Sequence, residues 1–448
     1  MIPQEMKMSL QELKIFKFLH QSNIKKDKGV CASKVFTTIF LLSFMKQTWF
    51  EQKAMSSRSD STFGKDVVYR FLNRPTNNWR KFLLLLSSHA IGLCARLTSQ
   101  NRVKVLVLDD TLYAKSRSKS VELLSTVYDH TTHKYVKGFQ CLTLGWSDGA
   151  TFIPVGFSLI ASANKLIKGI SNAIDKRTCG YKRRIEALDK KPNVACKMIR
   201  EALDAGIEAD YVLMDTWFTE APLIRSITAC GLDVIGMVKR GSKRLYNHDG
   251  STYTAERLMR HLNRNKQSHD IIGSIQTTTS TGIPVKLVYI KHRSNPKKWL
   301  VLLSTDQSLS DEEIVRIYGY RWQIEVCFKC NKSHLKLGTE FQCRSYDSLI
   351  AHTTIVFSRY IFLAWEQRKH NDDKTLGYLF FEFGEDVREV DFADALIALM
   401  SFILEIIITD KEEVLIKVSD FKNALLAFVS SLPPYLQRLL GVLMPTSG

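Results

Sequence analysis

Apolar and polar residues follow different rhythms in different parts of the chain. Over the first 100 residues, apolar side chains recur at helical spacing, which predicts helices over 34–55, 62–74 and 77–97. The short run Lys104-Val-Leu-Val-Leu108 is apolar and β-branched, so it predicts a buried strand. From Asp311 onward the helical rhythm returns. The pattern therefore predicts an α/β core between helical ends.

The middle of the chain carries most of the strand signals. Apolar runs over 139–146 and 151–159 flank Asp148-Gly149, which is the strongest hairpin signal in the sequence. The remaining predicted elements are a helix over 194–205, a strand over 211–214, a helix over 216–230, and strands over 234–238, 271–277, 285–290 and 299–304.

Composition and charge narrow the class of protein. The chain has 448 residues, of which 45% are hydrophobic, so it can bury a large core. It carries 63 Lys and Arg against 45 Asp and Glu, a formal net charge of +18. A strongly basic protein commonly binds a polyanion, and nucleic acid is the commonest one. The alternative is that the charge serves only solubility.

The cysteines and the apolar stretches indicate a cellular location. Nine cysteines, an odd number, are scattered along the chain, and this favours a reducing compartment. The N-terminus shows no secretory signal. The apolar stretches 350–365 and 396–409 are short or interrupted by charge, so neither is predicted to span a membrane. A cytoplasmic protein with no membrane partner is expected.

Two aspartates follow predicted strands. Asp109 ends the strand that begins near Lys104, and Asp215 ends the strand over 211–214. Ligand and metal sites tend to lie at strand ends in α/β sheets. Two carboxylates on neighbouring strands repel each other unless a cation neutralises them. The alternative is that each Asp caps the turn after its strand.

A third acidic residue lies in a motif with regular spacing. Tyr318, Arg321, Glu325 and Lys332 fall within roughly a 60° sector of one helix, at about 100° per residue. The alternative is a solvated helix face on which Arg321 and Glu325 form an ion pair. Three apolar residues are expected to bury the rest of this helix: Trp322, Ile324 and Phe328.

The spacing Tyr-x2-Arg-x3-Glu-x6-Lys resembles the signature of a large group of DDE-type insertion-sequence transposases. An Asp-x-Thr at the first strand end and an Asp at a later one stand in the order found in that group. The resemblance covers roughly residues 103–345.

The resemblance implies a ribonuclease H-like fold that holds two divalent metal ions, usually Mg²⁺, with Mn²⁺ as a possible substitute. By motif, the catalytic metal ligands would be Asp109, Asp215 and Glu325, with Asp110 as a rival for the first position. Arg321 and Lys332 resemble the basic residues that grip the terminal phosphates, with Tyr318 beside them. Independently of the resemblance, two metals about 3.5–4 Å apart with oxygen ligands suit phosphodiester cleavage.

The resemblance also divides the chain into domains. A helical, DNA-binding domain is expected over 1–100, and the catalytic core over 101–232 and 306–370. A β-rich insertion would occupy 233–305, and a helical region 371–448. Within the insertion, Trp299 resembles a transposase tryptophan that stacks on a flipped-out base, although a Trp that fills the core is an equal alternative.

The predicted function is that of a transposase that cleaves both ends of its own mobile element and joins the 3′-ends to target DNA. Its partners would be double-stranded DNA, bearing inverted-repeat ends, and a second copy of the chain, near the bacterial nucleoid. The rival hypotheses are a metal-dependent nuclease without strand transfer and a non-catalytic DNA-binding descendant of a transposase.

Four weaker signals stay open. Cys327-Phe-Lys-Cys330 suggests zinc but lies inside the signature helix. The segment 59–74, with Lys65, Tyr69, Arg70 and Asn73, is either a DNA recognition helix or a packing helix. The basic run 176–191 follows DNA backbone or is a solvated loop. The helices of 392–443 form core or a dimer surface.

Overall fold

The computed structural model divides the chain into two compact units. Unit 1 combines residues 1–77 with 332–448, and unit 2 is the continuous segment 78–331. The structure describes residues 2–26, 28–54, 63–99, 101–129, 132–239, 241, 244–264, 270–292, 295–370, 373–409, 423 and 427. The predicted boundaries at 100, 232, 305 and 370 differ from these unit limits, and the assignment of domains remains a prediction.

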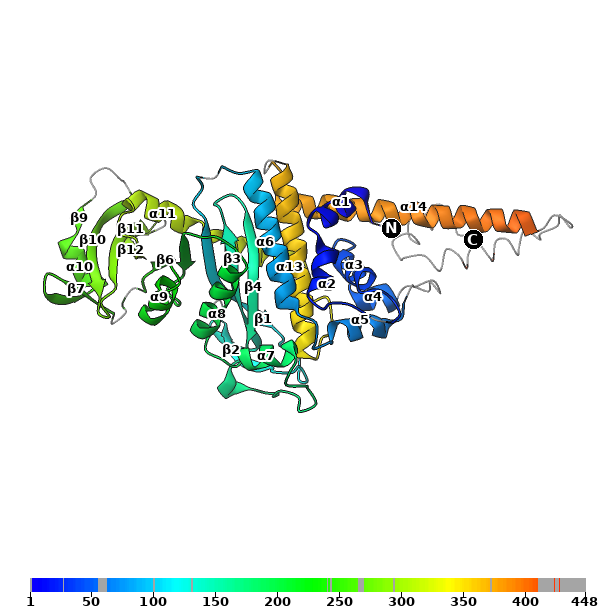
Figure 1. Ribbon diagram of the computed structural model, residues 1–448, viewed down its shortest axis with the longest axis horizontal. Coiled ribbons are helices and arrows are strands. Elements are labelled where there is room, and N and C mark those ends of the chain that lie inside the picture. The colour runs from blue at the N-terminus through cyan, green and yellow to red at the C-terminus, as the bar shows by residue number, and fades with distance from the viewer. Residues whose placement is uncertain are drawn as a thin grey trace. The chain divides into compact units, whose positions relative to one another are not determined.

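Unit 2 is built on one large mixed sheet (Figure 1). Among the described residues its order is β2-β3-β1-β5-β6-β12-β11-β10-β7-β8, with β4 paired to β3 and β9 to β10. The strands are β1 Val105–Ala114, β2 Ser125–Asp129, β3 Lys134–Ser147, β4 Phe152–Ile160, β5 Tyr211–Met214, β6 Asp233–Met237, β7 Leu245–His248, β8 Ser251–Thr254, β9 Asn263–Arg264, β10 Ile271–Thr279, β11 Pro284–His292 and β12 Asn295–Ser304.

Helices flank this sheet. Asn78 caps α6 by accepting a hydrogen bond from the Lys81 N–H, and Ser310 with Glu313 forms a capping box at the start of α11. The helices of unit 2 are α6 Trp79–Arg96, α7 Cys179–Glu186, α8 Lys191–Asp204, α9 Ala221–Thr228, α10 Ala255–Leu258, α11 Asp311–Gly319 and α12 Trp322–Ser333, with single 3₁₀ turns at Ala163–Lys165 and Met259–His261.

The core of the sheet has a ribonuclease H-like arrangement. β1, β3 and β4 form an antiparallel meander, and β5 and β6 then run parallel to β1. Every residue of β4 is buried, as expected for an uninterrupted apolar run in the sheet interior. The mixed sheet with flanking helices confirms the predicted fold class. The predicted hairpin at Asp148-Gly149 is also present, with Gly149 at φ 89°.

The β-rich block continues the same sheet. All four strands predicted between 233 and 305 are present, with somewhat different ends. However, β6 pairs in parallel with β5, so by its pairing this strand belongs with the core. The other strands reach it through β12, which is antiparallel to β6. The insertion therefore extends the sheet edge instead of forming a separate layer.

Unit 1 is helical and draws its helices from both ends of the chain. Helix α13 packs against α1, α3, α5 and α14. The helices of this unit are α1 Gln4–Glu12, α2 Ile15–Gln21, α3 Ala32–Leu42, α4 Trp49–Ala54, α5 Lys65–Leu72, α13 Tyr346–Lys369 and α14 Leu376–Thr409. The predicted helix over 34–55 is thus two helices, and most of the predicted C-terminal region after 409 lies outside the described residues.

A fully buried arginine joins the two ends of the chain within unit 1. The Arg359 guanidinium donates to the main-chain carbonyls of Ile39 and Phe40 and to the Glu340 carboxylate, at 2.9 Å for Phe40 and Glu340. Glu340 also contacts His352 at 3.0 Å. These bonds satisfy a buried charge that would otherwise destabilise the fold.

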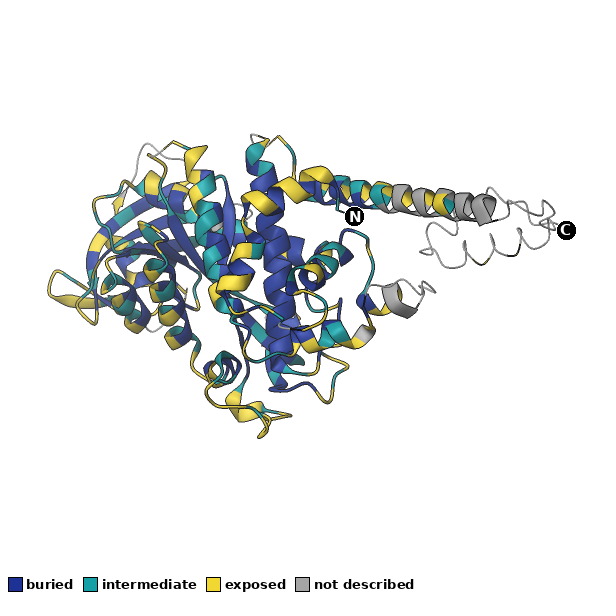
Figure 2. Ribbon diagram, turned by 45° about the vertical axis from the view of Figure 1, so that its right-hand side comes forward, coloured by how far each residue is buried: buried dark blue, intermediate teal, exposed yellow. Residues whose placement is uncertain are grey.

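Helix α13 is long and apolar enough to cross a membrane by length and composition. The apolar window of this helix is entirely buried inside the protein (dark blue in Figure 2), as in the core helix of a globular unit.

Candidate active site

The sheet register brings the first two predicted acids together. The parallel ladder between β1 and β5 ends at the pair Leu108 and Met214. Asp109 and Asp215 are the next residues on these neighbouring strands, so they leave the ladder at the same level. The strand was predicted to end at Asp109, but β1 continues to Ala114. The reason is that β3 pairs with β1 along its whole length.

Asp109 is the most perturbed carboxyl group of the site. Its side chain is 16% exposed. Its pKa is raised to about 7, chiefly by burial and also by the nearby Asp215 carboxylate, while the Arg321 guanidinium opposes the shift. The Asp110 N–H donates to Asp109 Oδ1 at 2.8 Å. Ionisation of this carboxyl group is therefore unfavourable, and a bound cation would favour the charged form.

Asp215 organises the turn after β5. Its Oδ1 accepts hydrogen bonds from the Trp217 and Phe218 N–H groups, at 2.9 and 3.1 Å. Burial raises the pKa of Asp215, and these two hydrogen bonds lower it. The alternative hypothesis, that Asp215 caps the turn after its strand, is thus correct for Oδ1. No hydrogen bond to Oδ2 is found among the described residues, so that oxygen is available to a ligand.

Arg321 links the other two predicted acids. Its Nη1 donates to Asp109 Oδ2 at 2.8 Å, and its Nη2 donates to Glu325 Oε1 at 2.6 Å. The guanidinium is 16% exposed, whereas Glu325 is 37% exposed. Arg321 therefore lies between two carboxylates, in the role of a counter-ion, and the predicted ion pair with Glu325 is present.

The signature residues do not share one continuous helix, which corrects the prediction. Helix α11 ends at Gly319, and α12 begins at Trp322. Between them the hydrogen bonds are of the i→i+3 type, including Arg321 N to Tyr318 O at 3.0 Å. Glycine favours this break because it is a poor helix former. Tyr318 consequently belongs to α11, and Glu325 to α12.

The remaining signature residues have different environments. Tyr318 is partly buried, with the Arg321 guanidinium carbon 5.9 Å from its ring centroid, and burial raises the pKa of its phenol. Lys332 is exposed on α12, where the two units divide. Ile324 and Phe328 are buried as predicted, but the prediction for Trp322 was wrong, since it is 64% exposed.

The segment between α11 and α12 is bound to the β3–β4 hairpin by Gln323, a residue that the sequence analysis did not single out. The Gln323 amide donates to Gly149 O at 2.9 Å, and its oxygen accepts from the Ser147 hydroxyl. Tyr320 also packs over Gly149, where a Cβ would lie 2.6 Å from the Tyr320 ring. The hairpin thereby fixes the segment that carries Arg321.

Asp110, the rival first ligand, has a separate partner. Its Oδ2 forms an ion pair with Lys191 Nζ at 2.5 Å. Lys191 Nζ also lies 4.5 Å from the ring centroid of Trp217, which is 44% exposed beside Asp215. The ion pairs thus favour Asp109 as the residue that faces Arg321 and Glu325. The signals for Lys191 and Trp217 were present in the sequence, as the end of the basic run and a Trp two residues after Asp215.

The donor set suits a divalent cation in its chemistry. Asp109, Asp215 and Glu325 offer only carboxylate oxygens, which Mg²⁺ and Mn²⁺ prefer. Burial is the main cause of the raised pKa values of Asp109 and Asp215, and neighbouring carboxylates add to it, so a cation would stabilise both charged forms. However, no group of three acids, histidines or cysteines close enough to hold an ion exists among the described residues. Arg321 is the cation at the site in this arrangement.

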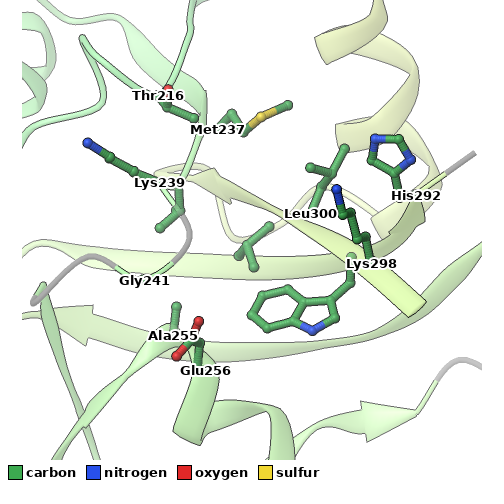
Figure 3. A pocket seen from close by; sticks show the side chains of 12 residues that line it. Thr216, Met237, Lys239, Gly241, Ala255, Glu256, His292, Lys298 and Leu300 are labelled. Atoms are coloured by element: carbon green, nitrogen blue, oxygen red, sulfur yellow. The ribbon is translucent and has the colours of Figure 1, made fainter. Parts of the chain in front are cut away.

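A pocket of about 320 Å³ is lined mainly by residues of the β-rich block (Figure 3). One wall is Thr216, the residue after Asp215, and another is Trp299 of β12. Lys239 and Lys298 line it as well. The Trp299 ring centroid is 5.7 Å from that of Tyr289, so the indole is braced from one side. Trp299 is partly exposed in the pocket, which argues against a purely core role.

Two of the weaker sequence signals have structural roles. The Cys327 thiol accepts a hydrogen bond from Asn331 at 3.2 Å, and burial raises the pKa of Cys330 to about 12. A thiol that resists ionisation is a poor zinc ligand. The basic run over 176–191 is partly interior, since Arg184 is buried in a two-fold hydrogen-bonded pair with Glu122.

Comparison with known proteins gives one family match. Residues 52–268 match the model of the family described as DDE superfamily endonuclease. The matched segment contains Asp109 and Asp215, and it ends before Glu325. No curated protein matches the chain. The match supports a DDE-type endonuclease or transposase, with a ribonuclease H-like fold and DNA as substrate.

Proposed function

We propose that the protein is a DNA transposase of the Tyr-Arg-Glu-Lys group, which cleaves the ends of its insertion sequence and transfers the 3′-ends to target DNA. The observation that carries the proposal is the site itself. Asp109 and Asp215 leave adjacent strands in register, and Arg321 joins Asp109 to Glu325. The family match supports the nuclease part, and the signature spacing supports strand transfer.

Asp109, Asp215 and Glu325 would hold two divalent ions, Mg²⁺ or Mn²⁺. When bound, such ions activate the attacking hydroxyl and stabilise the leaving oxygen. Arg321 would move from the carboxylates to a terminal phosphate, which its fork of N–H donors can bind through two hydrogen bonds. Lys332 would add a point charge, and Tyr318 would support the guanidinium. Trp299 would receive a displaced base in the pocket of Figure 3.

A joining assay tests the proposed function. The full chain is incubated with Mg²⁺, linear DNA that carries the inverted repeats flanking its coding region, and a target plasmid. Joined products support a transposase. Nicked or cut DNA without joining supports the nuclease alternative. A DNA fragment that is bound but stays intact supports the non-catalytic alternative. A synaptic homodimer and a cytoplasmic location belong to the same proposal.

A Trp299→Ala variant tests the pocket. We expect roughly tenfold weaker binding to DNA with an unpaired base near the cleavage point, because base–aromatic stacking contributes about 1–3 kcal/mol. Trp299→Phe keeps a ring and should retain most of the affinity. Gel-shift titration measures both variants. Equal affinity of wild type and Trp299→Ala would place Trp299 among the structural residues of the insertion.

A further inference from the structure

Unit 1 contains a hollow lined by basic side chains, far along the chain from the acids. Its volume is about 610 Å³. Three lysines of the loop after α2 line one side, and two arginines from α5 and the turn after it line the other. These residues are Lys25, Lys26, Lys28, Arg70 and Arg74. No Asp or Glu is among the described residues that line the hollow.

The loop that carries the lysines is fastened in place. Arg74 donates from Nη1 to Lys25 O at 2.7 Å and from Nε to the Thr76 hydroxyl at 3.0 Å. The Asn23 amide donates to Thr76 O at 3.2 Å. Gly29 turns the loop at φ 79°, a conformation that favours glycine. The three lysines are thus presented by an anchored loop, with the buried rings of Phe63 and Phe71 beneath it.

Four of the five cations lack a carboxylate partner within the described structure: Lys25, Lys26, Lys28 and Arg70. Like charges gathered in one hollow repel each other, and each pair a few ångströms apart costs on the order of 1 kcal/mol in a water-like medium. Elsewhere among the described residues basic side chains form ion pairs, as Arg80 does with Glu186. An anionic ligand would offset the repulsion in the hollow.

The form of α5 indicates what such a ligand would contact. The Tyr69 ring packs edge-on against Phe341 at 6.3 Å, and Asn73 accepts a hydrogen bond from the Ser345 hydroxyl at 2.5 Å. Of the four residues that suggested a recognition helix, these two are engaged by other residues of the unit, and the Lys65 side chain lies outside the described residues. Arg70 remains as the one described side chain that lines the hollow. Two arginines beside three lysines suit phosphates and offer little to distinguish bases.

We propose that this hollow binds the phosphate backbone of double-stranded DNA, without reading the base sequence. The proposal rests on the proposed function, which makes DNA the substrate. It adds a second contact, in unit 1, which contributes affinity and leaves sequence discrimination to other parts of the protein. Lys25, Lys28 and Arg70 supply most of the contact, because their side chains are exposed along the hollow.

The test compares two full-length triple variants with the wild type. One removes the charges of the hollow, Lys25→Ala, Lys28→Ala and Arg70→Ala. The matched control, Lys7→Ala, Lys14→Ala and Lys17→Ala, removes three exposed charges elsewhere in unit 1. Binding to duplexes of inverted-repeat and random sequence is measured by fluorescence anisotropy without divalent metal, between 50 and 300 mM salt. Thermal unfolding verifies that each variant is folded.

For the hollow variant we expect the slope of log K against log salt to become less negative by about 3, because each phosphate contact contributes roughly −0.9 to it. The loss should be equal for both duplexes, while the control retains the wild-type slope to within about 1. An unchanged slope, a loss as large in the control, or a loss confined to the inverted repeat overturns the proposal. DNA joining by the wild type is scored separately. If the wild type fails to cleave DNA, and the hollow variant still shows the expected loss of salt-sensitive binding, the proposed function is refuted and the assignment of the hollow stands.

Discussion

An Asp109→Asn variant is expected to lose DNA cleavage by roughly 10³-fold or more, and Glu325→Gln is expected to do the same. Each substitution removes a charged ligand of the proposed metal site, and electrostatic stabilisation by a bound metal contributes several kcal/mol to phosphoryl transfer. Initial rates of plasmid nicking with Mg²⁺ measure the effect. DNA binding without metal should stay close to that of the wild type, because neither acid binds phosphate.

The same Asp109 variant should change stability in a pH-dependent way. The pKa of Asp109 is about 7 in the folded chain, well above the ordinary value near 3.8. Between these pH values the folded state holds a proton that the unfolded state has released. The contribution of Asp109 to the free energy of unfolding therefore falls as pH rises from about 4 to 7. Asp109→Asn cannot titrate, so it lacks this fall. The free energy of unfolding of the variant, relative to that of the wild type, should therefore increase from pH 4 to 7 and stay constant above pH 7.

Asp110→Asn provides the matched control for both measurements. It neutralises the neighbouring carboxylate, which pairs with Lys191 and not with Arg321. We expect much of the cleavage activity to survive and no stability gain between pH 4 and 7. Loss of cleavage in Asp110→Asn together with normal cleavage in Asp109→Asn would transfer the first ligand position to Asp110. Normal cleavage by Glu325→Gln would remove Glu325 from the site.

Arg321→Ala is expected to separate cation binding from catalysis. Cleavage should fall roughly 10²-fold, because a terminal phosphate would lose hydrogen bonds from a charged donor. Mn²⁺ binding should tighten, by roughly tenfold, since a unit charge about 5 Å from a divalent ion costs on the order of 1–2 kcal/mol. Titration followed by electron paramagnetic resonance measures the binding. It should be done near pH 8.5, because the loss of Arg321 also raises the pKa of Asp109.

Arg316→Ala removes the same charge five residues earlier, on α11, where the guanidinium donates to the Tyr320 hydroxyl at 2.6 Å. This control should bind Mn²⁺ as the wild type does. Weaker or unchanged Mn²⁺ binding by Arg321→Ala would show that the arginine does not compete with metal at the carboxylates.

Elements with a strong local pattern were predictable. The apolar run of β4, the Asp-Gly hairpin and the alternation in β10 each specify a strand through side-chain burial or turn chemistry alone. The length of β1 was not predictable, because the polar residues Asp109, Asp110 and Thr111 interrupt the apolar run and are strand only through pairing with β3. The break between α11 and α12 was missed for a related reason, since apolar spacing continued across Gly319.

Within the site, residue types were predictable and contacts were not. The spacing from Arg321 to Glu325 predicts their ion pair. The bond from Arg321 to Asp109 joins residues 212 positions apart, so it depends on the tertiary fold. The hydrogen bonds of Gln323 with the β3–β4 hairpin depend on the tertiary fold in the same way. Such long-range contacts have no local signal in one sequence.

The discontinuity of unit 1 has a consequence for biosynthesis. The carbonyl of Phe40 on α3 is bound by Arg359, which is translated 319 residues later. Nascent chains emerge from the ribosome N-terminus first, and domains generally fold as they appear. The first 77 residues must therefore wait without their buried arginine while segment 78–331 is completed. Unit 2 can therefore fold before unit 1, whose early helices stay without their long-range partner until the C-terminal segment has been made.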